Sequence, residues 1–219
     1  IFRVLVLQAL YNLSDEAMEY QLRDRLSFMR FVGLGLEDAV PDAKTLWLYR
    51  EALAKAGAVE KLFDLFDGYL KARGYLAMGG QIIDATIVPA PRQRNSRDDN
   101  AKVKAGETPE EWEKCPAKNR QKDKDARWTK KHGRSHFGYK NHVCIDRKHK
   151  LVRRYAVTSA SVHDSQQFED LLDPDNTASV LWADSAYRSK ENEDKLAERN
   201  LKSQIHRRAH RNKPLTKRQ

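Results

Sequence analysis

The hydrophobic pattern of the chain changes its period once, and this change limits the folds that are open to it. Before residue 74 apolar side chains recur at helical spacing, most clearly in a stripe of six. The stripe consists of Val59, Leu62, Phe63, Phe66, Tyr69 and Leu70. From Gln81 the apolar runs are β-branched, beginning with residues 81–88, which Pro89 closes. The pattern predicts a small all-α region over residues 1–76 and an α/β domain over residues 77–219.

Capping residues divide the amino-terminal region into helices. Ser14 and the acidic residues after it predict a helix that Gly33 ends, and a second helix is expected from Pro41 to Gly57. Residues 1–73 carry a net charge of −1 and show no basic recognition face. DNA binding and a packing or dimerisation role therefore both remain open for this region.

The basic excess is concentrated in two blocks. The chain has 41 Lys and Arg against 31 Asp and Glu, a net charge of +10. Residues 92–134 have a net charge of +6 and residues 199–219 of +8. A solvated face for the first block and a solvated tail for the second are the alternatives to DNA binding. An excess of positive charge of this size makes nucleic acid the first partner to consider. The expected phosphate contacts are Lys130, Lys131, Arg134, Arg207, Arg208, Arg211 and Lys213.

Membrane insertion and disulfide bonding are not indicated. No apolar run approaches the roughly 20 residues that span a bilayer, and the opening residues lack the features of a secretory signal. Cys115 and Cys144 stand without a second Cys or a His at zinc-finger spacing. We expect a cytoplasmic protein with two free thiols and no membrane partner.

The elements after Gln81 predict a mixed sheet packed by helices. Strands are expected at residues 81–88, 136–145, 151–158, 179–183 and 202–206, with the second and third forming a hairpin. A short helix follows His163, with Asp164 as its expected cap, and ends before Pro174; another spans residues 189–199. A doubly wound sheet with an antiparallel edge fits the same order.

Residues 90–134 interrupt this order. They contain few aliphatic side chains, so we expect a mobile, basic insertion that does not fold alone. Trp112 and Trp128 lie among Lys and Arg, where they can stack on unpaired bases or serve local collapse.

Two aspartates stand at strand positions. Asp84 interrupts a β-branched run, and Asp184 follows the strand Val-Leu-Trp-Ala. A solvated strand face explains a lone Asp, but two carboxylates meet if their strands are neighbours. Convergent carboxylates favour Mg²⁺, which prefers oxygen ligands and supports phosphodiester chemistry.

Several segments resemble the DDE transposases of bacterial insertion sequences, in the fifth insertion-sequence family. They are IIDATIVPAPRQRN, DARWTKKHGRSHFGYKNHVCIDRKHKLV, VTSASVHDS and VLWADSAYRS, and the opening LVLQALYNLSDEAMEYQLRDRLSFMRFVGL resembles the family's amino-terminal helices. The resemblance implies a ribonuclease-H-like catalytic core in which Asp84 and Asp184 are the first two catalytic carboxylates. It also implies two divalent ions, Mg²⁺ or Mn²⁺, and the cutting of double-stranded DNA at terminal inverted repeats. The freed 3′-hydroxyls then join target DNA, and a homodimer is expected because two ends are handled together.

The resemblance places a third carboxylate, a glutamate on a helix, beyond the last core strand. This chain stops at Gln219 and begins with Ile1, so we expect both ends to be cut and little strand transfer by the chain alone. Glu191, Glu193 and Glu198 precede the last strand and are not assigned this role. A metal-dependent nuclease of the same fold and a non-catalytic DNA-binding remnant are the alternatives. His163 and Asp164 could also lie near the active site.

Overall fold

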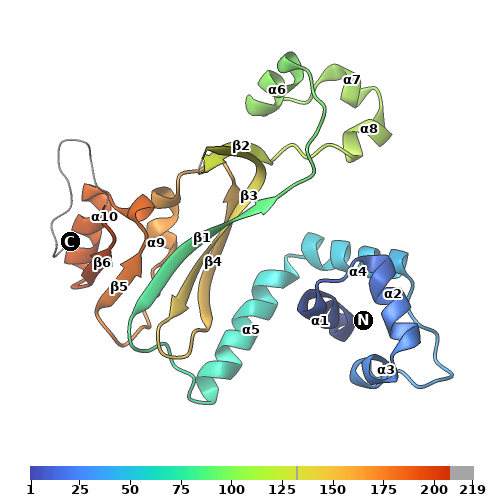
Figure 1. Cartoon of the computed structure of the whole chain (residues 1–219), viewed down its shortest axis with the longest axis horizontal. Coiled ribbons are helices and arrows are strands. Elements are labelled where there is room, and N and C mark those ends of the chain that lie inside the picture. The colour runs from blue at the N-terminus through green and yellow to red at the C-terminus, as the bar shows by residue number, and fades with distance from the viewer. Residues whose placement is uncertain (132, 208–219) are drawn as a thin grey trace. The chain divides into compact units, whose positions relative to one another are not determined.

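Two stretches of the chain form separate compact units in the computed structural model, which describes residues 1–131 and 133–207 (Figure 1). The first unit is Ile1–Gly74 and the second is Tyr75–Gln219. The division lies next to the boundary expected after residue 76. Each unit has a hydrophobic core of its own.

The first unit is helical. Its helices are α1 (Phe2–Tyr11), α2 (Asp15–Asp24), α3 (Leu26–Val32), α4 (Ala43–Lys55) and α5 (Ala58–Ala72). Ser14 caps α2 through the backbone N–H of Ala17, and Asp42 caps α4 in the same way. The single helix expected from Ser14 to Gly33 is wrong, because Arg25 adopts an extended conformation, with φ −112° and ψ 107°, and separates α2 from α3.

The core of this unit is built by α1 to α4. Its buried side chains are Val4, Leu7, Met18, Leu22, Phe28 and Leu46. Asp15 accepts two hydrogen bonds from Arg50, at 3.0 and 2.7 Å, and one from Gln8 at 2.6 Å, which links α1, α2 and α4. These contacts hold the pKa of Asp15 below its usual range, the bond to Arg50 having the largest effect. Helix α5 forms as expected but adds no buried residue.

The second unit contains a six-stranded mixed sheet. Its strands are β1 (Gln81–Pro89), β2 (Arg127–Lys131), β3 (Arg134–Asp146), β4 (Val152–Ser159), β5 (Val180–Ala183) and β6 (Lys202–Ile205). Strand β1 is antiparallel to β3 and parallel to β5, and β5 is parallel to β6. Strands β2 and β4 pair with successive parts of β3. The five expected strands are confirmed, including the hairpin of β3 and β4, whereas β2 was not expected.

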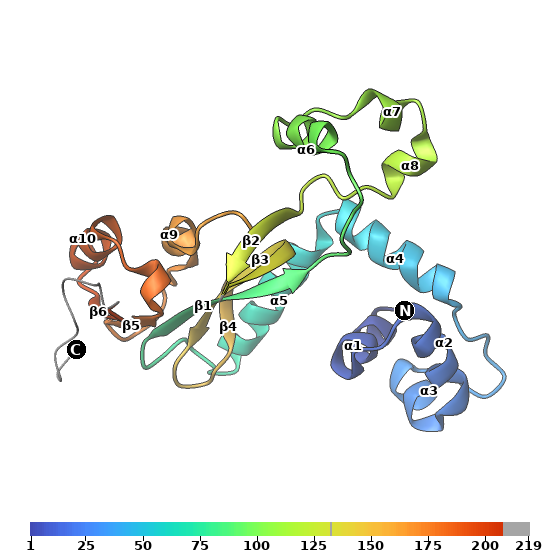
Figure 2. The same ribbon diagram turned by 45° about the horizontal axis from the view of Figure 1, so that its top comes forward.

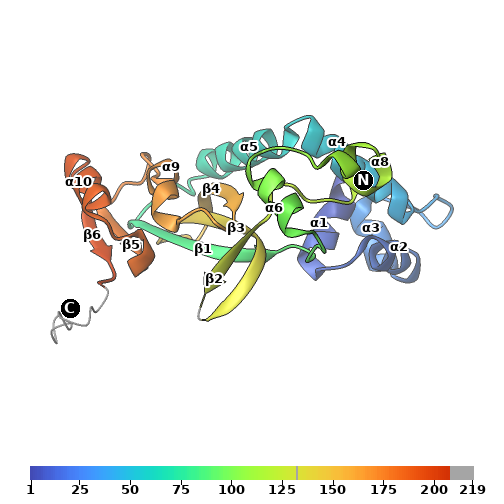
Figure 3. The ribbon, with the colours of Figure 1, turned by 90° about the horizontal axis from the view of Figure 1, so that it is seen from above.

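Helices pack on one face of this sheet (Figure 3). The helices are α9 (Phe168–Leu171), which continues the 3-10 helix η1 (Asp164–Gln167), and α10 (Lys190–Glu198). A further 3-10 helix, η2 (Ser185–Tyr187), joins β5 to α10. Phe168 and Leu196 are buried against Ile83 and Ala183, the inward residues of two parallel strands. This arrangement is the ribonuclease-H-like mixed sheet that was expected.

The segment between β1 and β2 has more structure than its composition predicts (Figure 2). It contains α6 (Arg97–Lys104), α7 (Glu110–Glu113) and α8 (Pro116–Arg120). Ser96 and Asp99 form a reciprocal capping box that stabilises the first turn of α6. Trp112 is fully buried, and the Lys122 ammonium lies 4.9 Å from the centre of its ring. The insertion therefore contains short helices, while its mobility and its inability to fold alone stay predictions.

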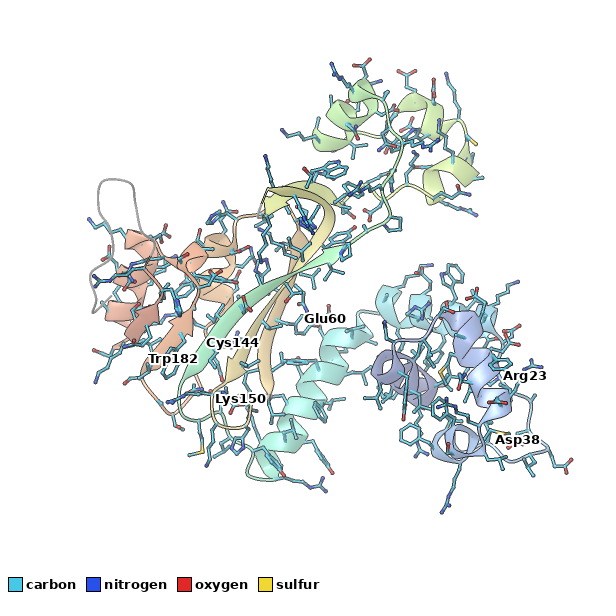
Figure 4. All side chains as sticks on the ribbon, viewed as in Figure 1. Arg23, Asp38, Glu60, Cys144, Lys150 and Trp182 are labelled. Carbon is cyan, nitrogen blue, oxygen red and sulfur yellow. The ribbon has the colours of Figure 1, made fainter. Side chains whose placement is uncertain are left out.

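Within the described ranges, no helix is both long and apolar enough to cross a membrane. Cys115 is exposed and Cys144 is buried, and both are free thiols as expected. Burial raises the pKa of Cys144 to about 12, which disfavours the reactive thiolate form. Figure 4 shows Cys144 on β3 and Trp182 on β5.

Candidate catalytic site

Asp84 lies near the middle of β1 on the sheet face opposite α9 and α10. Its neighbours Ile83 and Ala85 are buried in the core, and Asp84 is exposed, as the alternation of a strand requires. One carboxylate oxygen accepts the backbone N–H of Ala85 at 2.8 Å. The β1–β5 ladder ends at Ile83, so this N–H lies beyond the last pair of that ladder. The strand thus presents the carboxylate to solvent instead of burying it.

Asp184 directly follows β5. Its backbone has left the ladder, and one carboxylate oxygen accepts the backbone N–H of Ala186 at 2.8 Å, which caps η2. The short strand ends here because this cap starts the turn toward Tyr187. Asp184 is exposed, like Asp84.

The two aspartates occupy equivalent positions on neighbouring strands. The last paired residues of β1 and β5 are Ile83 and Ala183, and each aspartate is the next residue. Adjacent strands lie about 4.8 Å apart, so the two aspartates are neighbours in the backbone, and the convergence of their carboxylates stays a prediction. The expectation that their strands are neighbours is confirmed. Among residues 1–131 and 133–207, no Lys, Arg or His forms an ion pair with either one.

A buried polar layer lies close to the aspartates. His142, fully buried on β3, is 3.0 Å from the hydroxyl of Thr158 and 3.4 Å from that of Tyr187. Burial raises the pKa of Tyr187, and the negative charges of Asp164, Asp84 and Asp184 raise it further. Three carboxylates therefore act on one phenol. The sequence signal that could have indicated His142 is its place on the inward face of the expected strand 136–145.

Asp164 does not cap the helix that it was expected to cap. His163 is the capping residue, because its ring nitrogen accepts the N–H of Ser165 at 3.3 Å. Asp164 instead forms an ion pair with Lys140 at 2.8 Å, with both side chains largely buried. Lys140 also donates to the carbonyl oxygen of Val162 at 2.6 Å. The correction arises from a long-range contact that a local capping pattern does not contain.

The carboxylates of α10 serve local contacts. Glu193 pairs with Arg188 at 3.2 Å, and Glu191 pairs with Lys195 at 2.8 Å. In the part of the chain that the structure describes, no group of three or more His, Cys, Asp and Glu side chains is arranged to hold a metal ion. Metal binding by Asp84 and Asp184 therefore stays a prediction.

The first group of expected phosphate contacts gathers at one hairpin tip. Lys131 pairs with Arg134 in the β2–β3 ladder, Lys130 precedes them, and all three side chains are exposed. Arg207, after β6, is exposed. Arg208, Arg211 and Lys213 lie outside the described residues.

The two tryptophans of the insertion have different environments. Trp112 is fully buried, so local collapse is correct for it and base stacking is not. Trp128 is 51% exposed, tilted against Phe137 with ring centres 5.3 Å apart, and Arg92 lies 5.6 Å from the centre of its ring. Base stacking at Trp128 stays a prediction.

The fold and the aspartate pair define a ribonuclease-H-like domain with two carboxylates at adjoining strand positions. Residues 76–219, more than half of the chain, match the family model described as "Transposase DDE domain". Residues 1–52 match a second model, described as "Transposase domain (DUF772)". The chain belongs to the family of DDE transposases, as its motifs indicated. No solved structure matches it.

Proposed function

We propose that this protein is the transposase of an insertion sequence, which cuts the element ends and joins their 3′-hydroxyls to target DNA. The proposal is carried by the equivalent positions of Asp84 and Asp184 on neighbouring parallel strands in a chain of the DDE transposase family.

The aspartate pair suits a hard divalent ion such as Mg²⁺ or Mn²⁺. Its donor atoms are carboxylate oxygens, and each carboxylate uses only one oxygen for a described hydrogen bond. Magnesium is commonly bound by one or two carboxylates together with water and substrate phosphates. When bound, the ions activate the attacking oxygen and stabilise the leaving oxygen of a phosphodiester. Asp84 and Asp184 would hold them.

The backbone contacts of Asp84 and Asp184 support this role. The β1–β5 ladder sets the level of the two carboxylates, and the backbone N–H groups of Ala85 and Ala186 orient them. Lys130, Lys131 and Arg134, at the hairpin tip, supply positive charge for the DNA backbone. We propose a homodimer as the working form, since two element ends are handled together.

A strand-transfer assay tests this proposal. The substrate is a duplex carrying the inverted repeat that flanks the gene, with supercoiled plasmid as target and Mg²⁺ or Mn²⁺ present. The assay is run on the product of the complete gene, and we expect joined products. Asp84→Asn and Asp184→Asn should abolish them, while Asp194→Asn, an exposed change on α10, should not.

The products separate the alternatives. Cleavage without joining by the full product would replace the proposal with a nuclease function. Binding without any chemistry would replace it with a DNA-binding remnant. Activity that survives both substitutions would remove the catalytic assignment.

A further inference from the structure

The carboxyl ends of β5 and β6 are level with the middle of β1, and the three strands are parallel. Strand β5 pairs with β1 on one side and with β6 on the other, and Ala183 is level with Ile205. The next residue on each strand is Asp84, Asp184 or His206. The backbone N–H of His206 donates to the carbonyl oxygen of Ala183 at 3.0 Å, so the ladder still holds His206 in place. His206 is therefore the neighbour of Asp184 on the side away from Asp84.

A pocket of about 550 Å³ lies at this end of β5 and β6. Its walls include Trp182 and Gln204, which are level with each other on the two strands, together with Arg188, His206 and Arg207. The labelled side chain of Trp182 marks its position in Figure 4. The pocket falls within the usual volume range of ligand sites and is lined mainly by polar and charged groups.

The charge of the pocket is positive. Arg188 and Arg207 contribute two cations, and the one acidic residue in its wall, Glu193, is already engaged. Glu193 pairs with Arg188 at 3.2 Å and accepts the hydroxyl of Ser203 at 3.0 Å. Among the residues that the structure describes, the side chains of His206 and Arg207 have no hydrogen-bond or ion-pair partner. Both are exposed and available to an anion.

We infer that this pocket binds a backbone phosphate of the DNA strand whose reacting phosphodiester lies at Asp84 and Asp184, with Arg207 and His206 as the contacting residues. The inference rests on the proposed function and deepens it. His206 lies one strand spacing, about 4.8 Å, from Asp184. A phosphate held there is within about one or two nucleotides of the reacting one, since each nucleotide of a strand rises ~3.4 Å along the helix axis.

Metal binding by His206 is the competing assignment. Imidazole suits zinc and other transition metals, whereas Mg²⁺ and Mn²⁺ favour carboxylate, carbonyl and water oxygens. In residues 1–131 and 133–207, His206 completes no cluster of three potential metal ligands with the aspartates. The adjacent guanidinium of Arg207 also repels a cation and attracts a phosphate. Phosphate contact is the assignment that uses both side chains.

The first test measures how DNA affinity depends on salt. The probe is the duplex with the inverted repeat, and fluorescence anisotropy gives Kd over a series of salt concentrations. Arg207→Ala should weaken binding about ten-fold and reduce the slope of log K against log salt by about 0.9, the value of one phosphate contact. His206→Ala should weaken binding several-fold. Lys202→Ala, an exposed change at the amino end of β6, is the matched control and should alter neither quantity.

The second test finds the phosphate. A methylphosphonate, which removes the charge of one phosphate, is placed at each position near the element end in turn. The methylphosphonate at one position should weaken DNA binding by the unmodified protein. The same methylphosphonate should not weaken binding by Arg207→Ala any further, because the two changes remove the same contact. Additive losses at every position would overturn the inference, and the proposed function would stand. Failure of the unmodified protein to bind the duplex would overturn both.

Discussion

Asp84 and Asp184 are 100 residues apart in sequence but occupy equivalent positions on two hydrogen-bonded parallel strands. Each follows a residue buried in the core, Ile83 or Ala183, and each is exposed. Asp84 lies on the sheet face that α9 and α10 do not cover, and Asp184 begins the turn into η2. Two exposed carboxylates one strand spacing apart repel each other unless a cation lies between them. This relationship connects the fold to the proposed chemistry.

Neutralising either aspartate should lower the strand-transfer activity without lowering the free energy of unfolding. In Asp84→Asn and Asp184→Asn we expect strand transfer by the full reading-frame product to fall more than about a hundred-fold, since even outer-shell changes at metal sites cost 10–100-fold. The free energy of unfolding, measured by urea titration in EDTA, should stay the same or rise because the repulsion is removed. Asn also remains a good capping residue at position 184. A clear loss of stability would mean that the carboxylates serve the fold.

His142 should make the catalytic domain sensitive to acid. Burial lowers the pKa of His142, and Lys140 lowers it further, although Asp164 opposes them. A buried neutral histidine stabilises the folded state fully above its unfolded pKa of about 6.5, and the contribution is lost as pH falls through the folded value. The free energy of unfolding should therefore fall by up to about 1.4 kcal/mol per pH unit in that window.

Substitution of His142 isolates this effect. His142→Asn should flatten the pH dependence measured by urea unfolding, and His206→Asn, at an exposed position, should leave it unchanged. An equal pH dependence of the free energy of unfolding in the parent, His142→Asn and His206→Asn would show that His142 does not cause the loss of stability in acid.

The buried ion pair between Asp146 and Arg153 should be essential to the hairpin of β3 and β4. The side chains are 0% and 2% exposed, and the carboxylate also accepts the N–H groups of His149 and Leu151. Arg153→Met leaves a buried charge without its partner, which should lower the free energy of unfolding by about 3–5 kcal/mol. The double variant Asp146→Asn, Arg153→Met should recover part of this loss. A single variant as stable as the parent would contradict the assignment.

The hairpin of β2 and β3 should contribute to DNA affinity through charge. Lys130→Ala with Lys131→Ala should lower the slope of log K against log salt by up to about 1.8, two phosphate contacts at about 0.9 each. The control is Lys148→Ala with Lys150→Ala, which removes the same charge at the turn between β3 and β4. Equal slopes for the two double variants would show that the β2–β3 tip has no special role.

Local sequence signals predicted most of the sheet. The strands β1, β3, β4, β5 and β6 are bounded by Pro, polar turns or capping residues, and β1 is also marked by its β-branched run. Strand β2 was not predicted because Arg127–Lys131 is polar, and it is a strand through its pairing with β3. The break at Arg25 has no Gly or Pro to mark it.

The insertion shows the limit of a composition argument. Its content of aliphatic residues is low, but α6 is held by a local capping box at Ser96 and Asp99, and Trp112 supplies a large, fully buried side chain. The capping box was readable in the sequence, whereas the burial of Trp112 was not.

The site was predictable in part. Asp84 and Asp184 were visible as carboxylates at strand positions, but only the parallel pairing of β1 and β5 brings them together. The ion pair of Asp164 with Lys140 and the contacts of His142 depend on residues far apart in sequence. No local pattern encodes such contacts.

Iron-mediated cleavage of the polypeptide tests the aspartate pair most directly. Fe²⁺ replaces Mg²⁺ at an oxygen-rich site, and with ascorbate and peroxide it cuts the nearby backbone, which mass spectrometry locates. We predict cuts next to both Asp84 and Asp184, suppressed by excess Mg²⁺ and absent in Asp84→Asn. The absence of cuts at both residues would contradict a metal site shared by the two aspartates. Cuts that persist next to either residue in Asp84→Asn would contradict it as well.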